Sequence, residues 1–300
     1  MGVDNSSALG PRIIRHILDG NFDPATLRRG AEQIAKLIVT PSVEVPELTG
    51  PYVQDNFLGH ESLTVALYRM PSALAKISTY KINFRFFMFP ESWKFNIGLT
   101  SSSISTKEYM GYNKGIVSSF FGPTHREHAH DDRVPNNGFT YEGDVLNPFM
   151  ETDPLGQRRG AIVVYKNGVV RLVNDAEKWH ALSNSQGIKA ISGTSDYFED
   201  TDAPTHLDQH DRPRHATSFL IQDKGTGRLV YLPVVHPLER KAVFSVVKTF
   251  SLDFDIDAFT AVELDHNGAA IYVRDNKSSD TYVYPIDVTN HRRDHYGFEK

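Results

Sequence analysis

The sequence predicts an α+β fold, in which a mixed or largely antiparallel sheet system carries a few helices packed on its outside. Three observations support this prediction. Apolar and polar residues alternate between Tyr80 and Met88, which is typical of a strand with one buried face. Two later segments, 161–173 and 219–232, have the pattern of β-hairpins. The segment from Pro237 to Phe250 has apolar residues at helical spacing.

Helical periodicity marks the first 45 residues. Apolar residues recur three and four positions apart from Pro11 to Leu18, and Asp23-Pro24 then supplies an N-cap and a proline in the first turn. One apolar stripe follows, formed by Leu27, Ala31, Ile34, Ala35 and Ile38. The stretch 41–59 is rich in proline and glycine and is typical of a linker or surface loop. We expect a short N-terminal helical segment over residues 1–45 and an α+β domain over residues 46–300.

The strands of the second domain follow in order. After Tyr80–Met88, the residues Phe95, Ile97 and Leu99 repeat the period of two. Ala161–Tyr165 and Val169–Val173 flank Lys166-Asn167-Gly168, where Asn-Gly favours a type I′ turn. A second hairpin is expected where Phe219–Ile221 and Leu229–Leu232 flank the turn Asp223–Gly227.

One helix is expected within this domain. Pro237 can open it, and its buried face would be formed by Leu238, Ala242, Val246 and Phe250. A strand over Phe259–Leu264 follows the helix.

Composition excludes several classes of function. The chain of 300 residues has a formal net charge of −5 and no long block of lysine and arginine, which disfavours nucleic-acid and anionic-membrane partners. It contains no cysteine, which excludes disulfides, thiolate nucleophiles and thiolate metal sites. No stretch reaches the roughly 18 apolar residues of a membrane span, and no signal-peptide pattern is present. We therefore expect a soluble protein that is cytoplasmic or otherwise intracellular, without a membrane partner.

Histidine and acidic residues are concentrated in two segments, His125–Asp132 and His206–Asp211. Imidazole nitrogens and carboxylate oxygens suit zinc, manganese or iron, but the spacing matches no compact metal motif. Two interpretations stay open. The favoured one is a pair of solvated polar loops whose histidine and acidic residues do not all lie close together. The other is a divalent-metal site with the candidate ligands His125, His128, His130, His206, Asp208 and His210.

Two further segments carry residues suited to phosphate and sugar chemistry. Arg214 lies beside Pro213 just before an expected strand, where a guanidinium can bind phosphate through two parallel hydrogen bonds. Asp265 lies where the strand 259–264 ends, so its carboxylate can project into a cleft at the edge of the sheet. Taken alone, these fragments also fit a structural salt bridge of Arg214 and an ordinary Asp/Asn/Gly turn at Asp265.

Four fragments follow one another in a distinctive order: Gly115–Phe121, Val134–Leu146, Pro213–Ala216 and Leu264–Ala270. They resemble, in turn, four motifs of phosphodiester glycosidases, the domain of N-acetylglucosamine-1-phosphodiester alpha-N-acetylglucosaminidases. These motifs are the apolar-Asn-Gly-Gly-Phe-Phe segment, the Pro-Asn-Gly hairpin, the Pro-Arg-Thr-Ala start of a strand and the Leu-Asp-Gly-Gly-Gly-Ser-Ser turn. The resemblance covers roughly Gly111–Val273, about half of the chain.

The chain departs from the family pattern at several positions. Val117 stands where the family has asparagine, and Ser118-Ser119 replaces the glycine pair. His266 and Asn267 stand in the glycine-rich turn, and 234–237 replaces the family's Asp-Gly-Arg. Arg214 and Asp265 are retained, whereas other polar positions of the family are not, so either the pocket accepts another substrate or the scaffold binds without catalysis.

The resemblance implies cleavage between the anomeric carbon of a sugar and a phosphate oxygen. In that reaction Arg214 would neutralise the phosphate, and Asp265 would act as a base or stabilise the oxocarbenium-like centre. His215 or His266 would move a proton. The substrate-binding residues implied by the motifs are Ser118, Ser119, Asn137, Glu142, Asn267 and Gly268. The motifs around Ser118, Arg214 and Asp265 are expected to share one cleft.

The sequence therefore predicts a hydrolase that acts on a sugar-phosphate or related phosphodiester or glycosidic linkage, in a small molecule or a glycan. Two alternatives stay open. One is a non-catalytic binding or assembly protein, whose N-terminal helices would dock a protein partner or a second copy of the chain. The other is a metal-dependent phosphoesterase that uses the two His/Asp segments. A divalent metal is expected as cofactor only in this last case.

Overall fold

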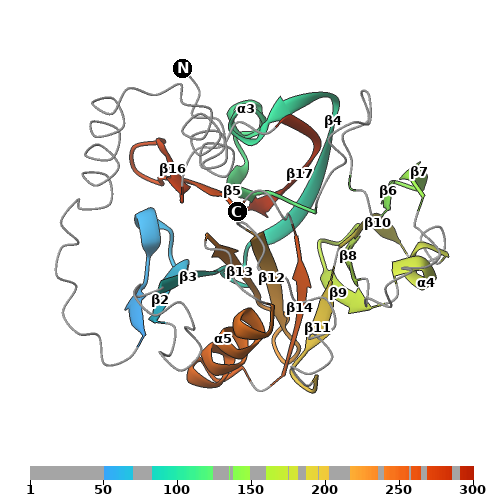
Figure 1. The fold of residues 1–300 in the computed structure, drawn as a ribbon. Coiled ribbons are helices and arrows are strands. Elements are labelled where there is room, and N and C mark those ends of the chain that lie inside the picture. Colours follow the sequence, from blue (N-terminus) through green and yellow to red (C-terminus); the bar gives the residue numbers. More distant parts are fainter. Residues whose placement is uncertain are drawn as a thin grey trace, which may run out of the picture. The chain divides into compact units, whose positions relative to one another are not determined.

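Antiparallel strands dominate the part of the chain that the structure describes (Figure 1). The structure is a computed structural model, and it describes residues 51–69, 83–123, 135, 138–148, 160–174, 176–181, 187–194, 196–202, 217–235, 240–256, 258–264, 269–285 and 291–300. All of them belong to one unit, Gly50–Lys300. The predicted helical segment 1–45 lies outside the described residues, so its helices and its docking role stay predictions.

Within the described residues the strands form three sheets. The first has the order β1-β2-β3-β13-β12-β14-β11, with β1 Tyr52–Gln54, β2 Thr64–Arg69, β3 Asn83–Met88, β13 Leu229–Val234, β12 Thr217–Asp223, β14 Phe259–Glu263 and β11 Tyr197–Glu199. The second has the order β7-β6-β10-β8-β9, with β7 Asp144–Asn147, β6 Phe139–Tyr141, β10 Ile188–Gly193, β8 Gly160–Tyr165 and β9 Val170–Asn174. The third has the order β16-β15-β5-β17-β4, with β16 Thr281–Tyr284, β15 Ile271–Arg274, β5 Ile116–Phe120, β17 His291–Glu299 and β4 Lys94–Ser105.

The predicted α+β class is wrong, because the described chain is a β-rich fold of antiparallel sheets with few helices. Its helices are the 3-10 turn η1 and α3, α4 and α5, at Phe57–Gly59, Thr106–Tyr112, Ala176–Ala181 and Arg240–Asp253. The physical reason is that period-two alternation recurs throughout the domain, whereas helical periodicity is sustained in α5. None of the helices in the described ranges has the length and apolar character needed to cross a bilayer.

The predicted helix of the second domain is confirmed as α5, which covers one face of the first sheet. Three residues of the expected apolar face, Ala242, Val246 and Phe250, are buried. The Phe250 ring stacks on Phe86 of β3 at 3.6 Å between centroids. At the C-terminal end of α5, the Asp253 carboxylate accepts a hydrogen bond from the Tyr68 hydroxyl of β2 at 2.6 Å.

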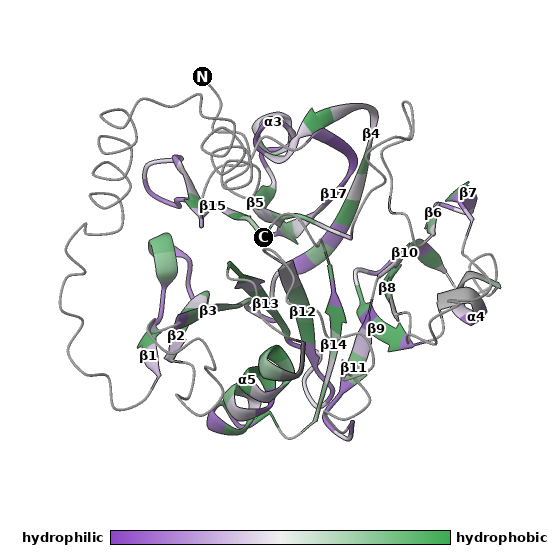
Figure 2. Cartoon of the chain, in the orientation of Figure 1, coloured by the Kyte–Doolittle hydropathy of each residue, from purple (hydrophilic) through white to green (hydrophobic). Residues whose placement is uncertain are grey.

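The opposite face of the first sheet contributes to a core shared by all three sheets. Strands β12, β13 and β14, each of which has hydrophobic segments in Figure 2, supply Leu220, Tyr231 and Val262 to it. Phe120 of the third sheet stacks on Tyr231 at 4.6 Å between ring centroids. Side chains along each strand point alternately to the two faces. The first sheet therefore separates the core under α5 from the core that all three sheets share.

Both predicted hairpins form, but the type I′ turn predicted at Asn167-Gly168 is wrong. Only Gly168 has a positive φ there, at 86°, whereas a type I′ turn needs positive φ at both central residues. The Gly168 N–H donates to the Tyr165 carbonyl at 2.9 Å, and the Tyr165 N–H donates to the Val169 carbonyl at 2.8 Å. These bonds define a hairpin loop of three residues, 166–168, in which the glycine has the left-handed conformation.

Positive φ at two successive residues, which a type I′ turn requires, occurs instead between β6 and β7, at Glu142 and Gly143, with φ of 51° and 95°. Glu142 has a Cβ in the left-handed region, which costs about 1–2 kcal/mol per residue for most side chains. We expect Glu142→Asn to raise the free energy of unfolding by about 0.5–1 kcal/mol, because asparagine tolerates this conformation better. Urea unfolding measures the change, with Glu91→Asn as a control at an exposed glutamate whose φ is not positive. Equal changes in the two variants would contradict the strain at Glu142.

Candidate functional site

Two adjacent strands of the first sheet meet in a buried polar pair at one end. The Thr217 hydroxyl, at the start of β12, donates to the Glu263 carboxylate at the end of β14, with 3.0 Å between the oxygens. The Leu264 N–H donates to the Ser218 carbonyl at 2.8 Å. Thr217 also pairs with Val234 at the end of β13. We call this end of the first sheet, defined by Thr217, Val234 and Glu263, the strand-end face.

The retained motif residues are close in sequence to the residues of this face. Arg214 precedes Thr217 by three residues, and Asp265 directly follows Leu264. Both lie outside the described residues, as do the other predicted members of these motifs, His215, His266, Asn267 and Gly268. The two segments are therefore joined to neighbouring ends of adjacent strands. That they share one cleft stays a prediction.

The third sheet contacts the first sheet at the start of β15. The Tyr231 hydroxyl of β13 donates to the Ala270 carbonyl at 3.2 Å. The Phe121 N–H, just after β5, donates to the same carbonyl at 3.3 Å. The end of the Gly115–Phe121 motif and the start of β15 are thus held together beside the first sheet.

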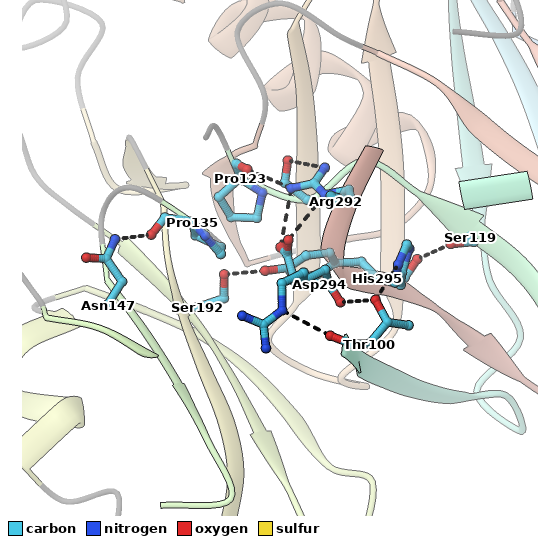
Figure 3. Close-up of polar contacts among 12 residues, drawn as sticks. Thr100, Ser119, Pro123, Pro135, Asn147, Ser192, Arg292, Asp294 and His295 are labelled. Carbon is cyan, nitrogen blue, oxygen red and sulfur yellow. Dashed lines mark hydrogen bonds and ion pairs between the residues drawn. The ribbon is translucent and has the colours of Figure 1, made fainter. Parts of the chain in front are cut away.

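A second buried polar group lies on the first half of β17, which Figure 2 shows as hydrophilic. Arg292 and Asp294 are both 0% exposed, and Arg292 donates from Nε and Nη2 to the two Asp294 carboxylate oxygens at 3.4 and 3.3 Å. Arg292 also donates to the carbonyls of Pro123 at 2.9 Å and Gly122 at 3.5 Å (Figure 3). This Arg292 cluster anchors the chain that leads from β5 into the first His/Asp segment.

Tyr296 extends the Arg292 cluster to the second sheet. Its hydroxyl is 2.6 Å from the Ser192 hydroxyl of β10, and its ring lies 5.7 Å from the Arg292 guanidinium carbon. Burial, followed by the charge of Asp294, raises the pKa of Tyr296 well above its usual value, so the phenol stays neutral. A Cβ added at Gly122 would lie 1.9 Å from the Tyr296 ring, so glycine is required there.

His295 lies between these cluster residues along β17 and belongs to a different contact. Its ring stacks on Tyr109 of α3, with 4.1 Å between centroids and 6° between planes. Its Nε2 is 3.5 Å from the Thr100 hydroxyl of β4. These contacts fix α3 on the third sheet.

The predicted binding residues Ser118 and Ser119 lie inside the third sheet, and both are fully buried. The Ser119 hydroxyl donates to the Tyr296 carbonyl at 2.7 Å. The Ser118 hydroxyl has no hydrogen-bond partner among the described residues, and Ser118 pairs with Val273 and Phe298. Their role in substrate binding stays a prediction.

The other predicted binding and metal residues are placed as follows. Glu142 is exposed in the β6–β7 turn, and Asn137 lies outside the described residues. The six candidate metal ligands also lie outside them: His125, His128, His130, His206, Asp208 and His210. In the part that is described, no group of three histidine or acidic residues is placed to hold a metal ion.

An open polar depression of about 770 Å³ lies beside the start of β2. It is lined by Asp55, Asn56, Glu61, Ser62, Thr64, Pro90, Glu91, Ser92 and Arg228. Thr64 begins β2 and Pro90 follows the end of β3, so this depression lies at the opposite end of these strands from Arg69 and Asn83. It does not involve the residues of the strand-end face.

The fold is similar to a known enzyme structure. The catalytic domain of zebrafish N-acetylglucosamine-1-phosphodiester alpha-N-acetylglucosaminidase, auto-inhibited by its pro-peptide, matches with a TM-score of 0.54 and 9% identity, over 84% of this chain and 85% of that chain. A hypothetical protein from Synechocystis matches with a TM-score of 0.38 and 9% identity, over 79% and 62% of the two chains. No family model and no curated protein matches the sequence. The likeness therefore shows a shared fold.

Proposed function

We propose that the chain is a hydrolase that cleaves the bond between a sugar and a phosphodiester at the strand-end face. The observation that carries the proposal is the fold shared with an enzyme named for this linkage. It is supported by the two retained motif residues: Arg214 shortly precedes β12, and Asp265 shortly follows the adjacent strand β14. Fold alone does not determine chemistry, so the residues must be tested.

The proposed step exchanges one bond for another at the anomeric carbon. The bond from this carbon to the phosphate oxygen breaks, and the phosphate leaves as a phosphomonoester anion beside Arg214. A water oxygen bonds to the same carbon, and its proton passes to Asp265, or to His215 or His266 when Asp265 stabilises the cationic centre. Because phosphate leaves readily as an anion, the step needs little general-acid catalysis.

The described residues would supply a rigid base for this chemistry. The hydrogen bonds of Thr217 and Leu264 join β12, which Arg214 precedes, to the end of β14, which Asp265 follows. The Arg292 cluster fixes Gly122 and Pro123. Sites supported by packed strands hold their geometry more accurately than sites supported by loops alone.

A hydrolysis screen tests the proposal. The purified chain would be incubated with the methyl diester of N-acetylglucosamine 1-phosphate and with UDP-N-acetylglucosamine, with and without EDTA, and its bound metals measured. Turnover that survives EDTA supports the proposal. Turnover that EDTA abolishes and zinc or manganese restores would favour the metal-dependent phosphoesterase instead. Saturable binding without any turnover would favour a non-catalytic protein.

Arg214→Lys tests the proposed phosphate contact. Lysine keeps the charge but loses the planar pair of donors, so we expect kcat/KM to fall about 10–100-fold, with KM raised and kcat lowered. Steady-state kinetics on the better substrate of the screen measure the change. Arg171→Lys, at an exposed arginine of β9, is the matched control and should leave both constants unchanged. Unchanged kinetics in Arg214→Lys would remove this arginine from the mechanism.

A further inference from the structure

Arg85 of β3, in the first sheet, contacts two tyrosines of β16, in the third sheet. Its Nη1 donates to the Tyr282 hydroxyl of β16 at 2.9 Å. Its guanidinium carbon lies 4.5 Å from the centroid of the Tyr284 ring. Arg85 is half-buried, and no carboxylate within the described ranges forms an ion pair with it.

Two other arginines that are buried or half-buried have more hydrogen-bond acceptors. Arg292 has the Asp294 carboxylate and two carbonyls. Arg274 donates to the carbonyls of Met110 and Ile116. Partial burial of a cation is costly without a counter-charge, and an aromatic face compensates only part of that cost. An anionic ligand would supply the counter-charge that Arg85 does not have among the described residues.

Strand pairing places Arg85 toward the strand-end face. Phe87 of β3 pairs with Tyr231 of β13 in antiparallel register. Arg85, two residues before Phe87, therefore lies nearer the end of β13 at Val234 than Phe87 does. Its side chain lies on the same side of the sheet as Phe87, which is part of the core shared by the three sheets.

Tyr284 is held beside β3 by its own strand, β16. It pairs with Ile271, the first residue of β15, which follows the anchored Ala270. The Tyr284 ring also contacts Phe87, with 6.0 Å between centroids. Burial raises the pKa of Tyr284, an effect that Arg85 opposes in part, so its hydroxyl remains protonated at neutral pH and can donate a hydrogen bond.

We propose that Arg85 and Tyr284 form an anion subsite of the strand-end face, which binds a phosphate group of the substrate. Tyr282 and the Tyr284 ring orient the guanidinium, whose remaining N–H groups and the Tyr284 hydroxyl are the donors. The inference rests on the proposed function for the identity of the substrate. Its ligand class, phosphate, can be tested separately.

Binding of inorganic phosphate, measured by isothermal titration calorimetry on the full chain, tests the subsite. We expect saturable binding that Arg85→Met weakens at least tenfold, since a charge-assisted hydrogen bond is lost. Tyr284→Phe keeps the ring and should weaken binding about 2–10-fold. The matched control is Arg171→Met, which removes an arginine that also lies over a tyrosine ring, 5.8 Å from Tyr165 on the second sheet. The control should bind phosphate like the parent.

The outcomes separate this inference from the proposed function. Phosphate binding that depends on Arg85, in a chain without turnover, supports the subsite and contradicts the hydrolase. Turnover with the same KM in Arg85→Met and in the parent overturns the subsite and leaves the hydrolase intact. Absence of phosphate binding by the parent, or equal binding by Arg85→Met, also overturns the subsite. Circular dichroism and Tm of each variant verify the fold, and if Arg85→Met does not fold, Arg85→Lys takes its place with the same expected direction.

Discussion

Arg292→Met is expected to lower the free energy of unfolding by about 3–5 kcal/mol, because it removes the Arg292 charge from beside the buried Asp294 carboxylate. Both side chains are fully buried, so water cannot compensate. The carbonyls of Gly122 and Pro123 lose their donor at the same time. Urea unfolding followed by circular dichroism measures the loss.

Arg293→Met is the matched control for this variant. Arg293 is the next residue of β17, is half-buried, and donates to the Thr100 carbonyl at 3.0 Å. We expect its removal to cost about 1 kcal/mol, the usual size of a partly exposed contact. A double variant, Arg292→Met with Asp294→Leu, should recover part of the stability because the buried carboxylate is removed as well. Equal losses in Arg292→Met and Arg293→Met would contradict the anchoring role of the Arg292 cluster.

Asp265→Asn is expected to lower kcat about 100–1,000-fold on a sugar phosphodiester, the usual cost of losing one transition-state contact. Asparagine is nearly isosteric with aspartate but has neither its negative charge nor its basicity. The cationic centre at the anomeric carbon would therefore lose its stabilising group or its base. Steady-state kinetics give kcat, and Tm shows whether the variant folds.

Asp275→Asn controls for the ordinary role of an aspartate in a turn. Asp275 accepts hydrogen bonds from the backbone N–H groups of Lys277 and Ser278 at 2.6 and 2.9 Å in the β15–β16 turn. These bonds lower the pKa of its carboxyl group. If Asp265 served only as a turn residue, both variants would lose some stability and keep full turnover. That result would remove Asp265 from the mechanism.

Local elements of the fold followed from the sequence, but its class did not. Alternation in the segment 80–88 and apolar spacing in 237–250 predicted β3 and α5, because each pattern reflects one buried face. The turns were harder, since Asn167-Gly168 takes another loop type while Glu142 adopts the left-handed angle. Tertiary contacts overrode the local preference at Glu142, whose N–H donates to the Lys189 carbonyl at 2.7 Å.

The Arg292 cluster was not predicted from the sequence. The run His291-Arg292-Arg293-Asp294-His295-Tyr296 has the charge of an exposed strand, and its burial depends on two sheets that meet around it. Its one sequence signal is the Arg-x-Asp spacing, which places two opposite charges on one face of a strand. Arg85 was missed for the same reason, since its tyrosine partners lie about 200 residues away in the chain.

Hydrolysis in water enriched with ¹⁸O tests the central claim most directly, because it shows which bond breaks. The substrate is the methyl diester of N-acetylglucosamine 1-phosphate, and the products are analysed by ³¹P NMR and mass spectrometry. Attack at the anomeric carbon puts ¹⁸O in the free sugar and leaves the released methyl phosphate unlabelled, which is the result we predict. Label in the phosphate would show attack at phosphorus and contradict the glycosidase mechanism.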